Sequence, residues 1–163
     1  MKKATKTAIL LLPMVYMLMA LPAKAAPVDV ATAQKAATNH LKMQHLTEKG
    51  EPLHWAATYR DTEQNDCFYV FNVGNRGFVL VGADDRCTPI LGFSPNGIWR
   101  SEQIPDNFAY LLESYRSSIS EGIRNNIAPI PEHLEEWNAL IHNDDSFYAK
   151  RGSKSVETLL STT

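Results

Sequence analysis

Two cysteines and five histidines are the side chains of this 163-residue chain that could supply a catalytic nucleophile, a general base or metal ligands. A catalytic thiol is commonly activated at a helix N-terminus, where the thiolate is stabilised. Cys67 lies in the strand-like run CFYVFN and Cys87 in the loop sequence DDRCTP, and neither is placed at a predicted helix N-terminus. We therefore predict that both cysteines are structural and that the chain is not an enzyme.

The spacing of the histidines does not suggest a metal site. His40 and His45 are five residues apart, and His133 and His142 are nine apart. Two imidazoles share one helical face at i, i+4, and no Cys-x-x-Cys motif accompanies these histidines. We predict no bound metal and no other cofactor.

The redox state of the two cysteines stays open at this point. In an exported protein, a disulfide between Cys67 and Cys87 would close a separation of 20 residues and add roughly 3 kcal/mol of stability. Two buried free thiols are the alternative. Sequence does not decide between them, because it does not show whether the two Cα atoms come within bonding range.

The triplet Asp84-Asp85-Arg86 has the composition of a catalytic acid pair beside a cation. Adjacent residues of an extended chain point in opposite directions, however, so the two carboxylates do not easily share one site. We expect Arg86 to pair with one of the two acids or with a carbonyl at the sheet edge. The triplet is therefore predicted to be structural.

The first 25 residues have the three parts of a secretory signal peptide. A basic start is followed by an apolar core at residues 8–21 and by Ala23-Lys24-Ala25, which has the small-x-small form of a cleavage site. A membrane anchor is the alternative, but this run of 14 residues contains Pro13, and a bilayer requires roughly 20 apolar residues. We expect cleavage after Ala25 and export to the periplasm or out of the cell, with no membrane attachment afterwards.

The charge of the exported part argues against a nucleic-acid partner. The chain has 16 basic and 18 acidic side chains, and removing residues 1–25 takes away four lysines and no acids, which leaves 12 against 18 and a net charge of −6. Nonspecific nucleic-acid binding depends on clustered Lys and Arg. The remaining length suits one domain, which we expect at residues 26–142.

Apolar and β-branched residues predict a sheet in the middle of the chain. Residues 67–72 and 78–83 read as two strands of a hairpin. The connecting residues that can adopt positive φ are Gly74, Asn75 and Gly77. Further strands are expected at residues 54–60 and 89–93, which would complete a small antiparallel sheet of three or four strands.

Helical periodicity occurs before and after these strands. Asp29 can cap a helix that reaches about Leu46, a second helix begins near residue 106 with Asp106 or Asn107 as its cap, and a third spans residues 131–142. The residues expected to face inward are Val30, Ala33, Ala37 and Leu41 in the first helix, Phe108, Leu111, Leu112, Tyr115, Ile119 and Ile123 in the second, and Leu134, Trp137, Leu140 and Ile141 in the third. The fold class is therefore α+β, with about three helices packed on the sheet and a polar linker and tail at 143–163.

Several short motifs follow one another in a characteristic order. They are YVFN at 69–72, GFVLV at 77–81, DDR at 84–86, PILGFS at 89–94, NFAYLLESY at 107–115 and VETLL at 156–160. The chain resembles the prodomain of streptopain-type cysteine proteases and the related Spi inhibitors, with VETLL at the junction before the mature protease. One departure is Arg76-Gly77-Phe78, where the family commonly has Gly-Gly-Phe, so Arg76 must avoid a glycine-only conformation or accept strain.

The resemblance implies a role for the segment before the second long helix. In streptopain-like zymogens this segment lies over the active-site cleft, and an asparagine there holds the catalytic histidine away from the cysteine. Asn107 occupies the matching position, with Ile104, Pro105 and Asp106 as its neighbours in contact with the protease. The alternative for Asn107 is an ordinary helix cap, and the two roles are compatible.

Three functions are consistent with this resemblance. The first is an exported, propeptide-like inhibitor that blocks a streptopain-like cysteine protease non-covalently, since no catalytic domain is expected in the chain. The second is an N-terminal remnant of a truncated or split proenzyme. The third is an exported binding or adhesion module that has kept the prodomain fold.

Overall fold

The computed structural model describes residues 25–46 and 51–149, so most of the expected signal peptide and the VETLL motif lie outside the described residues. The elements in chain order are α1 (Val30–Met43), β1 (Leu53–Arg60), β2 (Asp66–Val73), β3 (Gly77–Gly82), β4 (Ile90–Ser94), the 3-10 helix η1 (Ser101–Gln103), α2 (Asp106–Arg124) and α3 (Pro131–His142). The predicted α+β class is confirmed. Within the described ranges, no helix is both long and apolar enough to cross a membrane.

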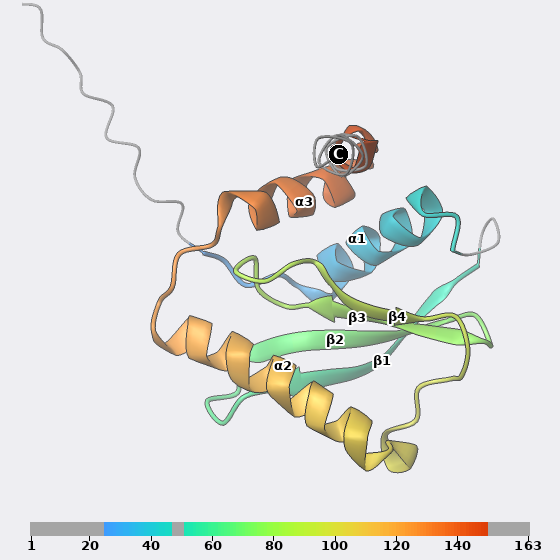
Figure 1. Ribbon diagram of the computed structural model, residues 1–163, viewed down its shortest axis with the longest axis horizontal. Coiled ribbons are helices and arrows are strands. Elements are labelled where there is room, and N and C mark those ends of the chain that lie inside the picture. The colour runs from blue at the N-terminus through green and yellow to red at the C-terminus, as the bar shows by residue number, and fades with distance from the viewer. Residues whose placement is uncertain (1–24, 47–50, 150–163) are drawn as a thin grey trace, which may run out of the picture.

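The four strands form one antiparallel sheet in the order β1-β2-β3-β4, so each strand pairs with its neighbour in sequence. Figure 1 shows α1 and α3 over one face of this sheet and α2 across the other. Because side chains alternate along a strand, each central strand supplies apolar groups to both faces. The hairpin predicted from β2 and β3 is confirmed, with Phe71 opposite Val79 and Val70 opposite Leu80.

The face covered by α1 and α3 has the larger core. Small residues of α1 let that helix lie close to the sheet, and aromatic and branched residues fill the remaining space. The buried members of this core are Ala33, Ala36, Ala37, Leu41, Leu53, Tyr69, Phe71, Val73, Val79, Val81, Ala83, Trp137 and Leu140. Burial of this apolar area provides much of the stability of the domain.

The opposite face is covered by α2, which crosses β2. The buried residues of the core between this face and α2 are Cys67, Phe68, Val70, Leu80, Trp99, Leu112 and Ile119. Leu111 was predicted to face inward here, but this prediction is wrong, because its side chain is 40% exposed. The helical phase defined by Leu112, Tyr115 and Ile119 places Leu111 on the outer edge of the apolar stripe.

The two long helices begin in different ways. Asp29 caps α1 as predicted, with its carboxylate accepting a hydrogen bond from the Thr32 N–H at 2.9 Å. The predicted cap of α2 by Asp106 or Asn107 is wrong, because Pro105 is the N-cap residue and no side chain caps this helix. Pro105 has the extended backbone that an N-cap requires, and its carbonyl accepts from the Phe108 and Ala109 N–H groups.

In the turn between β2 and β3, only one position has a positive φ that favours glycine. Gly74 has φ of +51°, whereas Asn75 and Gly77 stay out of the left-handed region, contrary to the expectation for them. Arg76 also avoids that region, so the expected strain is absent there, and its guanidinium pairs with Glu51 at 3.0 Å. Gly77 is instead required by space, since a Cβ would lie 2.5 Å from the Ser94 carbonyl oxygen.

The segment after α3 differs from the exposed linker predicted from residue 143 onward. Residues 146–149 form a helical turn, and Tyr148 is half-buried against the domain. Its hydroxyl donates to the buried Glu136 carboxylate at 3.0 Å and lies 3.3 Å from Nδ1 of His40. This contact places the start of the C-terminal segment beside α1 and α3.

Candidate functional site

The segment that enters α2 lies at the surface of the molecule. Ile104 is half-buried, whereas Pro105, Asp106 and Asn107 are exposed. The Asn107 side chain makes no hydrogen bond within the part of the chain that the structure describes. Its amide can therefore donate to and accept from a partner molecule.

Two apolar side chains extend this exposed surface along α2. Tyr110 is 80% exposed and Leu111 is 40% exposed, and they follow Asn107 at i+3 and i+4 on the same helical face. Sequence reasoning missed both as surface residues. The available signal was the phase of the apolar stripe, which places Tyr110 opposite the core and Leu111 at its margin.

Aromatic rings support this segment from beneath. Trp99 is 6% exposed, and its ring lies 5.4 Å from that of Phe78 and 5.9 Å from that of Phe108, measured between centroids. Phe78 also contacts Phe108 at 5.9 Å. The motif residue Phe78 thus joins β3 to the first turn of α2, where Asn107 lies.

The Asp84-Asp85-Arg86 triplet lies elsewhere and joins three parts of the fold. Asp84 is 3% exposed and accepts from the backbone N–H of Arg86 at 3.0 Å and from its guanidinium at 2.7 Å. The Nε of Arg86 donates to the Ile127 carbonyl at 2.8 Å, just beyond α2. Asp85 accepts from the Ala26 N–H at 2.8 Å, so it holds the N-terminal segment.

The structure does not bring the triplet and Asn107 into one site. Arg86 contacts the chain after the C-terminal end of α2, whereas Asn107 lies in its first turn. A helix of 19 residues is roughly 28 Å long, so the two groups are far apart. The contacts of the triplet give it a structural role at the junction of the N-terminal segment, the α2–α3 connection and the sheet.

Both cysteines are free thiols in the structure, and no disulfide joins Cys67 to Cys87. Burial raises the pKa of the Cys67 thiol to about 11 and that of the Cys87 thiol to about 12. The Cys87 thiol also donates to the Asp84 carbonyl at 3.0 Å. Across the described ranges, no cluster of three or more His, Cys, Asp or Glu side chains could hold a metal ion.

Under reducing conditions, the folded chain should show no thiol-dependent peptide hydrolysis and only slow alkylation by iodoacetamide. With a pKa of about 11, about one Cys67 thiol in a thousand is ionised at pH 8. Mass spectrometry of the alkylated protein checks this, with the urea-unfolded chain as the fast-reacting control. Hydrolysis that disappears on mutation of either cysteine would contradict the structural assignment.

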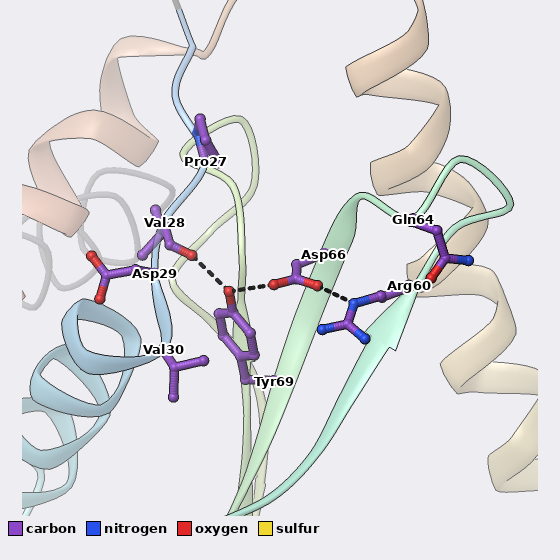
Figure 2. Close-up of a pocket in the computed structure, with 8 residues that line it drawn as sticks. All are labelled: Pro27, Val28, Asp29, Val30, Arg60, Gln64, Asp66 and Tyr69. Atoms are coloured by element: carbon purple, nitrogen blue, oxygen red, sulfur yellow. Dashed lines mark hydrogen bonds and ion pairs between the residues drawn. The ribbon is translucent and has the colours of Figure 1, made fainter.

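A cavity of about 680 Å³ opens between the N-terminal segment and the β1–β2 hairpin. It is lined by Pro27, Val28, Asp29, Val30, Arg60, Gln64, Asp66 and Tyr69 (Figure 2). The Tyr69 hydroxyl lies 3.0 Å from both the Val28 carbonyl and the Asp66 carboxylate, which pairs with Arg60 at 2.6 Å. These central polar groups bond to one another, and the lining contains no serine, cysteine or histidine that could act as a nucleophile or imidazole base.

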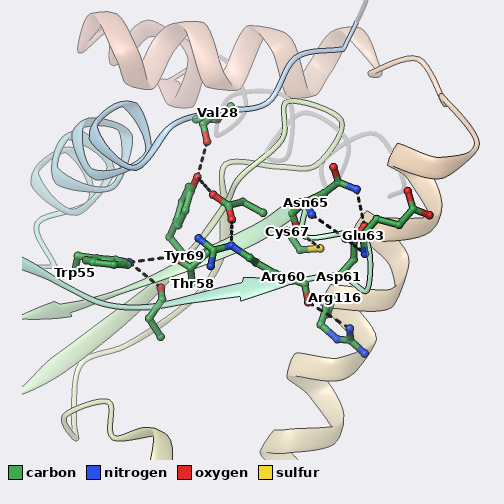
Figure 3. Close-up of polar contacts among 12 residues, drawn as sticks. Val28, Trp55, Thr58, Arg60, Asp61, Glu63, Asn65, Cys67, Tyr69 and Arg116 are labelled. Carbon is green, nitrogen blue, oxygen red and sulfur yellow. Dashed lines mark hydrogen bonds and ion pairs between the residues drawn. The ribbon is translucent and has the colours of Figure 1, made fainter.

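A second set of polar contacts lies in the adjoining loop between β1 and β2 (Figure 3). Asp61 is 6% exposed and accepts from the backbone N–H groups of Glu63 and Asn65 at 2.9 and 2.8 Å. It also accepts from the Ser120 hydroxyl of α2 at 3.1 Å. Burial raises the pKa of Asp61, but these hydrogen bonds and one from the Asn65 amide outweigh it and lower the pKa, so the ionised carboxylate connects this loop to α2.

These features define a class before they define a family. Within the described residues the two thiols are buried or half-buried with raised pKa and the central polar groups of the cavity pair with one another, whereas the Asn107 amide in the first turn of α2 is exposed and available to a partner molecule, as a protein-binding domain requires. A family model described as Spi protease inhibitor matches residues 25–119, and the chain belongs to this family. The family consists of inhibitor domains, which agrees with a non-catalytic role.

Two curated proteins show the same relationship. The chain is 31% identical over 116 residues to the thiol protease/hemagglutinin PrtT of Porphyromonas gingivalis, a match that covers 67% of this chain and 13% of PrtT. It is 40% identical over 53 residues to streptopain of Streptococcus pyogenes, which covers 32% of this chain and 13% of streptopain. The chain therefore spans a small part of the curated relatives that it matches. No solved structure matches it significantly.

Proposed function

We propose that this protein is an exported inhibitor of a streptopain-like cysteine protease. Residues 104–107 enter the active-site cleft of the protease, and the surface formed by Asn107, Tyr110 and Leu111 contacts its rim. The observation that carries the proposal is the exposed and unpartnered Asn107 amide at the start of α2, in a chain of the Spi protease inhibitor family. The prodomain-like match to streptopain supports the choice of target.

The chemistry of the segment favours non-covalent blockage. A carboxamide both donates and accepts hydrogen bonds, so Asn107 can bond to the catalytic histidine and to polar groups beside the thiol. A side-chain amide is not presented for attack in the way that a peptide carbonyl placed in line with the thiolate would be. Inhibition is therefore reversible and competitive with substrate.

Export follows from the signal-peptide features of residues 1–25. The family match begins at residue 25, and the described fold begins with the pairing of residues 26–28 to the chain around Asp84. Cleavage after Ala25 would turn the Ala26 nitrogen into a charged amine 2.8 Å from the Asp85 carboxylate. An ion pair would then replace the present hydrogen bond, so cleavage at this point is compatible with the fold.

Asn107→Ala tests the proposal directly. The substitution should weaken inhibition of a streptopain-like protease tenfold or more, which corresponds to a loss of about 1.4 kcal/mol of binding free energy. The free energy of unfolding should change by less than about 0.5 kcal/mol, because Asn107 is exposed and caps nothing. The measurements are inhibition constants against streptopain and against a streptopain-like protease of the source organism, with urea unfolding of the same samples.

Asn138→Ala is the matched control, since Asn138 is an exposed asparagine on α3 over the other face of the sheet. This variant should inhibit as the unaltered chain does, and a serine protease such as trypsin should be unaffected by either. Equal inhibition by the Asn107 and Asn138 variants would remove Asn107 from the active site. If the unaltered chain inhibits no streptopain-like protease, the proenzyme-remnant function is favoured instead.

A further inference from the structure

The side chain of Asn72 holds the backbone of a residue 27 positions later in the chain. Its Oδ1 accepts a hydrogen bond from the Trp99 N–H at 2.7 Å, and its Nδ2 donates to the Trp99 carbonyl at 3.5 Å. An amide that both donates to and accepts from one residue fixes its position and orientation, much as a strand partner does. Asn72 belongs to β2, the second strand of the sheet, so it supplies a rigid support.

Trp99 lies in the middle of the connection from β4 to α2. Residues 95–105 contain one short 3-10 helix, and their other hydrogen bonds in the described structure stay within residues 94–109. The two bonds from Asn72 are therefore the hydrogen bonds that attach this connection to the sheet. The connection ends at Pro105 and leads directly to Asn107.

Packing of the Trp99 ring does not by itself fix the backbone of the β4–α2 connection. The Trp99 ring is buried among Phe78, Phe108 and Tyr59, but its indole N–H has no hydrogen-bond partner in the described part of the chain. Ring contacts of this kind hold the side chain, whereas the path of the backbone toward η1 depends on the peptide groups of Trp99. Those are the groups that Asn72 bonds.

We propose that Asn72 is a positioning residue for inhibition, because it pre-orders the segment that presents Ile104 to Asn107. This inference rests on the proposed function. A segment already held in its bound conformation loses less conformational freedom on binding, and the affinity is higher for that reason. Asn72 acts through Trp99 and is not placed at the surface that meets the protease.

The test compares Asn72→Ala with Asn39→Ala. Asn39 is the matched control, because its amide also bonds a distant backbone group, the Leu140 carbonyl at 2.7 Å, but on the α1–α3 side of the sheet. Asn72→Ala should weaken inhibition of a streptopain-like protease tenfold or more, while Asn39→Ala leaves inhibition unchanged. Asn72→Asp should inhibit better than Asn72→Ala but less well than the unaltered chain, since it keeps the acceptor for the shorter bond and replaces the donor that faces the Trp99 carbonyl by an oxygen.

Hydrogen exchange supplies a readout that a general loss of stability does not reproduce. The Trp99 amide should exchange at least tenfold faster in Asn72→Ala, and the amides of α1 and α3 should exchange as in the unaltered chain. If Asn72→Ala does not fold, Asn72→Leu gives the same comparison, because leucine has a similar size and no hydrogen-bonding group.

The outcomes separate this inference from the proposed function. If the unaltered chain inhibits and Asn72→Ala inhibits equally well, the positioning role alone is overturned. An unchanged hydrogen-exchange rate of the Trp99 amide would overturn it as well. A loss of inhibition that Asn39→Ala matches would also overturn it. Absence of inhibition by the unaltered chain would overturn the proposed function, and the positioning role with it.

Discussion

Val79→Asp is expected to lower the free energy of unfolding by several kcal/mol and to leave much of the protein unfolded at moderate urea concentrations. Val79 is fully buried on β3, opposite Phe71 of β2 and Phe93 of β4, in the core under α1 and α3. A carboxylate placed there has no described positive partner and loses its hydration. The urea midpoint, followed by circular dichroism, measures the effect.

His54→Asp is the control for Val79→Asp, because it introduces the same side chain at an exposed position of β1. Its unfolding free energy should change by less than about 0.5 kcal/mol. Equal midpoints for the two variants would mean that Val79 faces water. The register of β2 and β3 would then be shifted by one residue, since such a shift exchanges the two faces of a strand.

Asp84→Ala should destabilise the fold by about 3 kcal/mol, because it leaves the Arg86 guanidinium largely buried without its carboxylate partner. The Arg86 side chain is 13% exposed and the Asp84 side chain 4% exposed, so water compensates little for the lost ion pair. Asp84 also accepts the Arg86 backbone N–H, and the loop that holds Cys87 and the Ala26 contact should loosen with it. Thermal and urea unfolding measure the loss.

Glu113→Ala tests whether burial of the ion pair is the reason for the large loss of stability expected for Asp84→Ala. Glu113 pairs with Arg116 on the surface of α2, where its side chain is 56% exposed, and removal of such a pair should cost no more than about 0.5 kcal/mol. A similar cost for the Asp84 and Glu113 variants would show that the triplet contributes no more than an exposed pair. Inhibition by folded Asp84→Ala should remain, since the triplet lies at the opposite end of α2 from Asn107.

These expectations separate two groups of residues in the domain. Val79 and Asp84 maintain the fold, and their substitution should change inhibition only through loss of folded protein. Asn107 and Asn72 should change inhibition with smaller effects on unfolding, because the first is exposed and the second is half-buried at the end of a strand. Measuring both quantities on every variant therefore distinguishes the core from the proposed protease-binding segment.

The elements of the fold were predictable from local sequence. Continuous runs of apolar, aromatic and β-branched residues identified the strands at 67–72 and 78–83, helical spacing identified α3 with its bounds at 131–142, and Asp29 was correctly assigned as the cap of α1. These signals are local because a strand or helix places its own neighbours in sequence on one face. The short chain connections then left few ways to arrange an antiparallel sheet with covering helices.

Only the tertiary structure decided which residues of the candidate site cap the helix, which pack in the core and which remain exposed. Sequence placed Asn107 at a helix start and offered Asp106 or Asn107 as its cap, but Pro105 is the N-cap residue and no side chain caps α2. Sequence also placed Leu111 in the core, whereas the phase of α2 leaves it at the surface. The contact between Asn72 and Trp99 joins residues 27 apart, and no periodicity encodes it. Such contacts depend on how β2 and the β4–α2 connection meet in space, which the packing of the Trp99 ring and the two hydrogen bonds from Asn72 determine together.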